Sequence, residues 1–238
     1  MPQDVAPLSE FLKREHPNVV TMVDNCYGEF VCEKEPTHFG ADICVGSLIK
    51  NPGGGLAPTG GYIVGREDLI VRISYRLTAP GIGREVGSYA GSYQPFYQGL
   101  FVAPHVVAQA LKTAVLAAAV FQDLGMQTTP SAEEERSDII QALTLGTPER
   151  LIAFCRGIQA ASPIDSMALP EPWDMPGYQH PVIMAAGTFV SGASIELSAD
   201  APMREPYVAY LQGGLTYGHG KLAVQKTLEG MVEKGLIK

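Results

Sequence analysis

Cysteine is scarce in this chain, and its few cysteines follow no metal-binding spacing. Cys26, Cys32, Cys44 and Cys155 include no Cys-x-x-Cys pair. Structural zinc sites commonly use such pairs, whereas isolated cysteines in an intracellular protein stay reduced. We therefore expect reduced thiols, a cytoplasmic location and no bound metal ion.

Positive charge and long hydrophobic runs are also limited. The chain has 17 Lys and Arg against 25 Asp and Glu, giving a net charge of -8. This balance disfavours nucleic acid and anionic membranes as partners. Residues 1–5 lack the basic stretch and apolar block of a signal peptide, so no export is indicated. The most apolar segment, residues 102–124, contains His105, Lys112 and Asp123 and predicts a buried helix, not a membrane span.

The composition is that of a globular protein. Hydrophobic residues make up 46% of the 238 residues and charged residues 18%, enough for a substantial core and a second, smaller one. Short apolar strands with crossovers predict a parallel or mixed α/β sheet. We expect strands at residues 19–24, 42–46, 62–64, 137–145, 182–186 and 194–197, an amphipathic segment at 66–75, a loop at 78–99, and helices at 102–124, 151–161 and 221–234.

Two residues have a layout that suits pyridoxal phosphate chemistry. Asp24 closes one predicted strand, and Lys50 follows it by 26 residues, shortly after the next strand. A carboxylate can hold a protonated pyridine nitrogen, while an amine forms the Schiff base and moves protons. The lysine must be neutral to react, and its apolar neighbours Val45, Leu48 and Ile49 predict a lowered pKa. A capping aspartate and a solvated loop lysine are the structural alternative.

Four longer stretches carry a family resemblance. Residues 47–61, 76–83, 170–178 and 192–200 resemble the methionine gamma-lyase-like family of aluminium resistance proteins, and Asp24-Asn-Cys-Tyr27, Gly40-Ala-Asp-Ile43 and Ser47-x-x-Lys50 carry a broader resemblance. That family is similar to the cystathionine lyase-like, fold-type I pyridoxal phosphate enzymes. The resemblance covers nearly the whole chain. It implies that residues 1–125 form part of a cofactor-binding large domain that ends in a long connecting helix, and that residues 126–238 form a small α+β domain.

The resemblance also implies roles for particular residues. Lys50 would be the Schiff-base lysine, Asp24 the partner of the ring nitrogen and Ser47 a hydroxyl donor to the cofactor phosphate. The broader family has a second hydroxyl just before the lysine, where this chain has Ile49. Glycines 53–55 could instead let backbone N–H groups approach an anion. Arg204 is the candidate to bind the substrate carboxylate, with Arg76, Arg84 and a simple surface ion pair as alternatives.

The resemblance also bears on how much of the enzyme is present. Only 23 residues precede Asp24, whereas the family places a phosphate-binding helix start and a ring that stacks on the cofactor before this aspartate. We therefore expect a C-terminal portion of a longer enzyme. By itself it should bind the cofactor weakly and turn over poorly. Its partners would be a small amino-acid substrate and either a second copy or the missing N-terminal half.

Other motifs are weaker. Lys50 precedes Gly53 instead of following the glycines, which disfavours a nucleotide phosphate loop. His105 and His219 are expected to be structural, and Cys26 has no identifiable histidine partner that could make it a nucleophile. Tyrosines recur every fourth residue at 89, 93 and 97, which predicts one face of a short helix or, alternatively, the lining of a substrate cleft.

Two hypotheses for function remain. The first is a carbon-sulfur lyase in which Lys50 removes the α-proton and the substrate loses a β- or γ-substituent. The second is a catalytically inactive remnant that acts only through a partner subunit. Reduction with borohydride separates them, because only the first leaves a pyridoxyl label on Lys50.

Overall fold

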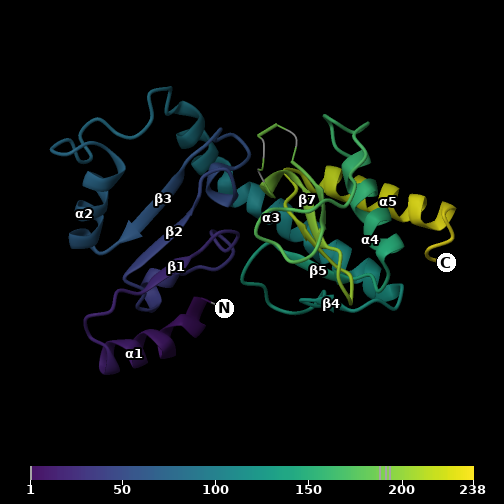
Figure 1. The fold of residues 1–238 in the computed structure, drawn as a ribbon, viewed down its shortest axis with the longest axis horizontal. Coiled ribbons are helices and arrows are strands. Elements are labelled where there is room, and N and C mark those ends of the chain that lie inside the picture. Colours follow the sequence, from purple (N-terminus) through teal and green to yellow (C-terminus); the bar gives the residue numbers. More distant parts are fainter. Residues whose placement is uncertain (1, 188, 191, 193) are drawn as a thin grey trace.

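The computed structural model describes residues 2–187, 189–190, 192 and 194–238, which form two β-sheets (Figure 1). Strands β1, β2 and β3, in that order, make the first sheet, and the order in the second sheet is β4-β5-β8-β7-β6. The strands are β1 Met22–Asp24, β2 Ile43–Ser47, β3 Gly61–Gly65, β4 Thr128–Thr129, β5 Gln141–Thr144, β6 Val182–Ala185, β7 Ser198–Pro202 and β8 Val208–Gln212.

The first sheet is mixed, as the sequence predicts. β1 and β2 run parallel and β2 and β3 run antiparallel. Helices α1 (Val5–Glu15) and α2 (Glu67–Leu77) flank it and are short and mainly exposed (Figure 1). Only Ser9 of α1 and Ser74 of α2 are buried. This part of the molecule therefore has little helical cover.

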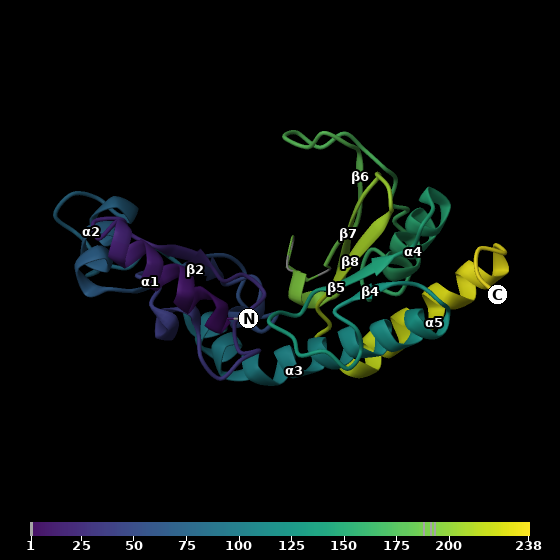
Figure 2. The same cartoon turned by 90° about the horizontal axis from the view of Figure 1, so that it is seen from below.

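Helix α3 (Gln94–Asp123) runs along both sheets (Figure 2). It is the one helix in the described ranges with the length and composition of a membrane span. Its buried residues are small or apolar and pack against the rest of the chain: Gly99, Ala103, Val106, Val107, Ala110, Thr113, Ala114, Ala117, Ala118 and Phe121. The predicted loop at 78–99 was wrong in its last part, because α3 begins at Gln94 with a proline in its first turn, where no N–H is needed.

The second sheet has the larger core. Helices α4 (Pro148–Ala160) and α5 (Tyr217–Glu233) pack together beside it, and the rings of Phe121 and Phe154 meet edge to face with centroids 5.6 Å apart. A Cβ on Gly157 of α4 would lie 2.6 Å from Thr227 Oγ1 of α5. A glycine is therefore needed for the two helices to approach this closely.

Predictions for this second region were partly right. The side chain of Thr147 caps α4 by accepting a bond from Arg150 N at 3.3 Å, and Pro148 is the first helical residue, both as expected. The strand predicted at 194–197 was wrong: Ser194–Glu196 forms a 3-10 helix, and β7 starts just after it. β4, β7 and β8 were not predicted.

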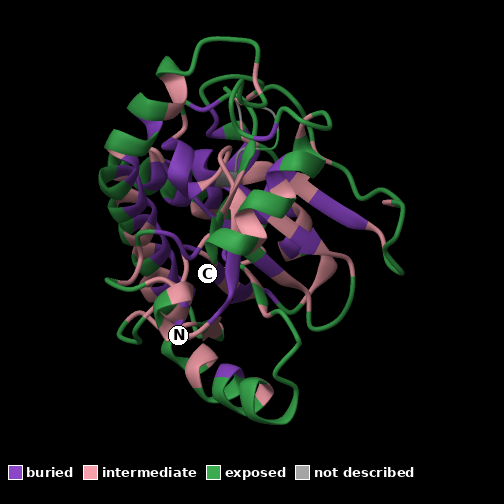
Figure 3. Ribbon diagram, turned by 90° about the vertical axis from the view of Figure 1, so that its left-hand side faces the viewer, coloured by how far each residue is buried: buried purple, intermediate pink, exposed green. Residues whose placement is uncertain are grey.

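Burial differs along the chain, as Figure 3 shows by colour. Residues of the inner strands and the facing sides of α3, α4 and α5 are buried, while the outer helices and loops are exposed. The α/β fold class is as expected from the sequence. The division into domains at residue 126 stays a prediction. The stretch 192–200 that contributed to the resemblance is described apart from Ala193, which lies outside the described residues.

Candidate functional site

Asp24 and Ser47 lie at the same edge of the first sheet, namely the edge at which β1 and β2 have their carboxyl ends. Each is the last residue of its strand, and in the parallel register of β1 and β2 Asp24 pairs with Val45. Because side chains alternate along a strand, Asp24, Val45 and Ser47 share one face of the sheet. Lys50 lies in the turn that follows β2. The order of residues along the sequence thus brings the three predicted cofactor residues to one edge.

Asp24 has the properties of an ionised acid. Its side chain is exposed, and Oδ1 accepts a hydrogen bond from Cys26 N at 3.0 Å. This bond is the main cause of a lowered Asp24 pKa, and the nearby Lys50 ammonium lowers it further. A negatively charged group is therefore available at this edge for a protonated ring nitrogen.

Lys50 differs from the sequence prediction. Its ammonium Nζ lies 4.6 Å from the centroid of the Tyr27 ring. Burial by itself would lower the pKa of Lys50, but attraction to Tyr27 and Cys26 outweighs it, and the pKa is raised. The predicted lowering by apolar neighbours was therefore wrong. The side chains of Tyr27 and Cys26 stabilise the charged form of the lysine.

Ser47 and the adjacent glycines are engaged in local turns. Ser47 Oγ accepts a bond from Ile49 N at 3.3 Å, which leaves its O–H free to donate elsewhere. The N–H groups of Gly53 and Gly54 donate to Lys50 O and Asn51 O, both at 3.1 Å. These two N–H groups are thus engaged within the turn, so the expected anion contact stays a prediction for Gly55 alone.

The glycines serve packing instead. A Cβ on Gly99 of α3 would lie 2.2 Å from Gly53 O, and one on Gly53 would lie 1.7 Å from Leu48 O. The loop after Lys50 therefore contacts the helix through backbone atoms. This close approach packs the turn that contains Lys50 directly against α3.

The sequence reasoning missed Asn51 as a structural residue. Asn51 is fully buried, and its Nδ2 donates to Tyr27 O at 2.9 Å and to Glu29 O at 3.1 Å. Its position directly after Lys50 was the only feature of the sequence that could have indicated a structural role for Asn51. These two bonds join the lysine turn to the loop that follows β1.

A buried acid on the other face of β2 was also missed. Glu29 is 4% exposed, accepts a bond from Tyr62 Oη at 2.8 Å, and lies against Gly46. Burial raises the pKa of Glu29 to about 7, and the charge of Glu35 adds to this effect. Glu29 and Glu35 border an otherwise largely apolar cavity of about 310 Å³. Glu29 is thus separated from Asp24 by the sheet.

Arg204 lies apart from the other predicted site residues. It is exposed in the turn between β7 and β8, and within the described ranges no carboxylate lies within ion-pair distance of it. It lines a cavity of about 500 Å³ with His180, Asp200 and Tyr210, to which no residue between 24 and 50 contributes. Its role toward a substrate stays a prediction.

The remaining candidates have structural surroundings. His219 Nε2 lies 2.9 Å from Ala161 O, so its ring joins α5 to the end of α4. Burial and Asp24 raise the pKa of the Cys26 thiol, which makes it a poor nucleophile. The short helix predicted through the tyrosines was wrong: Tyr89 precedes α3, Tyr93 is its N-cap residue, and both rings pack around Phe96.

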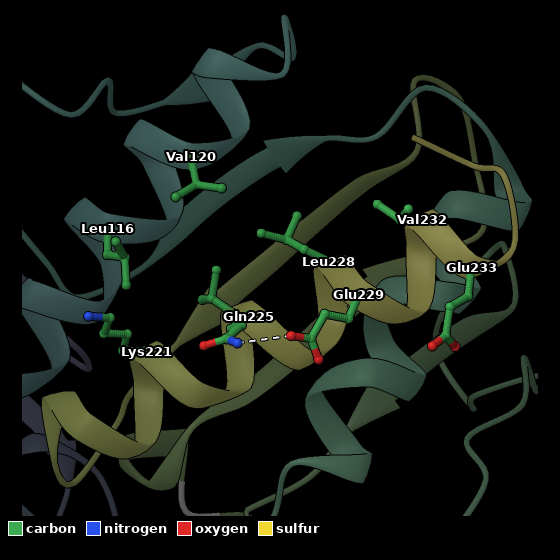
Figure 4. Close-up of a pocket in the computed structure, with 9 residues that line it drawn as sticks. Leu116, Val120, Lys221, Gln225, Leu228, Glu229, Val232 and Glu233 are labelled. Carbon is green, nitrogen blue, oxygen red and sulfur yellow. Dashed lines mark hydrogen bonds between the residues drawn. The ribbon is translucent and has the colours of Figure 1, made fainter. Parts of the chain in front are cut away.

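A groove between α3 and α5 is separate from this edge (Figure 4). Its volume is about 570 Å³, with an apolar floor that includes Leu116, Val120 and Leu228. Charged groups such as Lys221 and Glu229 stand along it, and Gln225 donates to Glu229 at 2.9 Å. It contains none of the predicted site residues.

Comparison with known proteins places this arrangement in a family. The sequence model of methionine gamma-lyase matches residues 2–232. The chain belongs to the methionine gamma-lyase family. Within the family, the Bacillus subtilis protein YnbB, named as uncharacterised, is 54% identical over 98% of this chain and 56% of its own length.

Solved structures of family members superpose closely. A Clostridium novyi carbon-sulfur lyase involved in aluminium resistance has a TM-score of 0.91 and 51% identity, covering 98% of this chain and 54% of its own. A candidate cystathionine beta-lyase involved in aluminium resistance from Listeria innocua has a TM-score of 0.92 and 52% identity, with coverages of 96% and 56%. This methionine gamma-lyase family chain thus spans about half the length of these relatives.

A more distant likeness concerns the fold alone. A Campylobacter jejuni structure, described as a candidate O-acetylhomoserine (thiol)-lyase carrying a pyridoxyl-lysine, has a TM-score of 0.53 and 13% identity over 93% of this chain. The α/β arrangement of this methionine gamma-lyase family chain therefore extends to such enzymes.

Proposed function

We propose that this chain carries the lysine and the acid of a pyridoxal phosphate-dependent carbon-sulfur lyase acting on a sulfur amino acid. One observation carries the proposal: an ionised Asp24 at the end of β1 lies near enough to Lys50, in the turn after the adjacent parallel strand β2, for the lysine to lower its pKa. Membership of the methionine gamma-lyase family supports the same chemistry. The four cysteines are free thiols, in keeping with a cytoplasmic location.

The residues present fit two of the three parts of the cofactor. The Asp24 carboxylate suits the protonated ring nitrogen, and the Lys50 amine suits the aldehyde. For the phosphate, this edge offers the Ser47 hydroxyl, while the N–H groups of Gly53 and Gly54 are engaged. We therefore propose that these residues alone hold the cofactor weakly, and that the isolated chain turns over poorly.

When bound, pyridoxal phosphate supplies an electron sink for the bond broken at the substrate's α-carbon. Asp24 keeps a negative charge at the sheet edge, which favours protonation of the ring nitrogen. Lys50 must lose its proton and leave the Tyr27 ring before its amine can react. It can then accept the α-proton and return one later, so that a β- or γ-substituent leaves. Arg204 is our candidate for the α-carboxylate, although it would have to approach this edge.

An inactive remnant that acts only through a partner subunit is the second candidate. The observation that favours it is the contact of the Lys50 ammonium with the Tyr27 ring, together with a raised Lys50 pKa, because both favour the protonated amine over the free base that the chemistry needs. In that case the chain would keep the fold of the family without its chemistry.

Borohydride reduction in the presence of pyridoxal phosphate tests the proposal. We expect weak absorption at the violet edge of the visible range, which borohydride removes, and a pyridoxyl label that mass spectrometry locates on Lys50. Lys50→Arg should abolish this label, and Lys226→Ala, which changes an exposed lysine of α5, should leave it intact. Tight stoichiometric binding would contradict the weak-binding part of the proposal.

A second labelling experiment distinguishes the active lyase from the inactive remnant. The part of YnbB that lies outside the matched region is added to the chain, and labelling is repeated. Stronger labelling of Lys50 supports the lyase. A label spread evenly over surface lysines, with or without the added part, supports the remnant.

A further inference from the structure

Tyr27 has an unusual backbone conformation directly beside the candidate lysine. Its φ is +76°, in the left-handed region that aromatic residues seldom adopt. The turn around it is closed by Gly28 N donating to Asn25 O at 2.9 Å. An unfavourable conformation persists only where surrounding contacts fix it, and such positions cluster at functional sites. Contacts from elsewhere in the chain must therefore hold Tyr27.

Two donors from separate parts of the chain hold the Tyr27 carbonyl. Asn51 Nδ2 donates to it at 2.9 Å, and Ile139 N donates to it at 3.2 Å. Asn51 Nδ2 donates a second hydrogen bond to Glu29 O, so the turn after β1 is attached to one buried side chain. The Tyr27 side chain packs against a buried cluster that includes Val107 of α3. The Tyr27 backbone is thus held by two hydrogen bonds, and its side chain is held by packing.

This fixed ring lies under Lys50. The Nζ–centroid distance of 4.6 Å is within the range of a cation–π contact. The charged or titratable groups that act on the lysine are Asp24, Cys26 and Tyr27, and all three favour its charged form. Because Asn51 is the next residue after Lys50, one short turn both presents the lysine and fixes the ring that holds it.

We infer that Tyr27 and Asn51 are positioning residues that keep Lys50 in a protonated resting place at the sheet edge. Tyr27 supplies the aromatic face, and Asn51 fixes that face by holding the Tyr27 backbone. The lysine reacts only when it leaves the ring. This inference adds two positioning residues to the site of the proposed function. It rests on the proposed function only in taking Lys50 as the amine that reacts.

The test measures how readily Lys50 itself reacts, without any cofactor. The full chain is acetylated with trace acetic anhydride from pH 7 to pH 11, and mass spectrometry compares Lys50 with Lys226 in the same sample. Tyr27→Asn removes the ring but tolerates the positive φ. We expect it to lower the apparent pKa of Lys50 and to raise its labelling rate at pH 8 about two- to fivefold, the factor that loss of a partly exposed cation–π contact corresponds to.

Control variants separate the ring from other causes. Tyr27→Phe keeps the aromatic face and should behave like the unmodified chain, which a general loosening of the turn would not produce. Asn51→Ser should shift Lys50 in the same direction as Tyr27→Asn. Circular dichroism checks that each variant is folded, and Tyr27→Phe still tests the idea if Tyr27→Asn does not fold. Should Tyr27→Phe also release Lys50, the hydroxyl group is responsible and the role given to the aromatic face is wrong.

The outcome that overturns the inference is a folded Tyr27→Asn variant with an unchanged Lys50 labelling profile. The proposed function fails separately. In that case pyridoxal phosphate does not label Lys50, although the Tyr27 variants still alter its reactivity toward the anhydride.

Discussion

The two sheets of this molecule are built differently, although α3 runs along both. Beside the second sheet, a continuous cluster of buried apolar residues includes Phe121, Leu143 and Phe154. In the described part of residues 2–65, the buried apolar residues other than glycine are Ala41, Ile43, Cys44, Ala57 and the prolines Pro2, Pro36 and Pro52. The same stretch buries several polar side chains: Ser9, Asn25, Glu29, Asp42 and Asn51. The candidate chemistry thus lies in the region with the smaller core, where hydrogen bonds do much of the positioning.

The helices show the same contrast. Thr147 and Thr216 cap α4 and α5 with side-chain hydrogen bonds. The N-cap residues of α1, α2 and α3 make no such bond. Local sequence signals and tertiary packing therefore agree in the second region. In the first region the structure depends more on contacts between distant residues.

The largest expected effect is on the second core. Phe154→Ala removes a fully buried ring and should lower the free energy of unfolding by about 3–5 kcal/mol. Ile43→Ala, in the first sheet, should lower it by about 2 kcal/mol, because the few buried neighbours there can close around the gap more easily. Urea unfolding followed by circular dichroism measures both changes.

Trp173 makes this comparison sharper. It is the only tryptophan and forms a β-bridge with Val182 of β6, so its fluorescence follows the second sheet. Phe154→Ala should shift the fluorescence transition to lower urea. If Ile43→Ala shifts it equally, the two regions unfold as one unit, and the contrast in core size has no consequence for stability.

The next prediction concerns the buried acid of the first region. Glu29 has a pKa raised to about 7, so the folded state binds its proton more tightly than the unfolded chain does. Its contribution to stability is therefore complete below the ordinary glutamate pKa and is lost as the pH rises through about 7. The total change over this window is on the order of 3 kcal/mol.

Urea midpoints between pH 4.5 and pH 8 measure this effect. Glu29→Gln keeps an acceptor for Tyr62 but cannot ionise, so the decline in stability with rising pH should become shallower. Glu133→Gln, at an exposed position, is the matched control and should keep the decline. An unchanged slope in Glu29→Gln would show that another group titrates in this window.

The contrast also explains which features could be predicted from the sequence. β1, β2 and β3 were recognisable as short apolar runs that end at turns or at an acid. β7 was not, because its sequence Ser-Ala-Asp-Ala-Pro has low strand propensity. It is a strand because it pairs with β6 and β8, and its alanines are small enough to be buried under the helices. Such pairing depends on residues far away in the chain.

The site shows the same limit. The positions of Asp24 and Lys50 along the chain predicted correctly that both lie at one sheet edge, because neighbouring parallel strands end together. The raised pKa of Lys50 could not be predicted from its apolar neighbours. It depends on the side chains of Tyr27 and Cys26. The Tyr27 backbone is held by Asn51 and Ile139, and the bond from Ile139 joins residues far apart in sequence.

The smallest expected effect tests the helix caps. Thr147→Ala removes the acceptor of Arg150 N at the start of α4 and should lower the free energy of unfolding by about 1 kcal/mol. Thr147→Ser keeps the hydroxyl and should restore most of the lost stability. Trp173 fluorescence in urea is again the measurement, since α4 packs on the second sheet. If serine and alanine destabilise equally, the methyl group of Thr147 matters more than its hydrogen bond. The side chain of Thr147 would then stabilise α4 through packing, and the contrast between capped and uncapped helices would have no energetic consequence at this position.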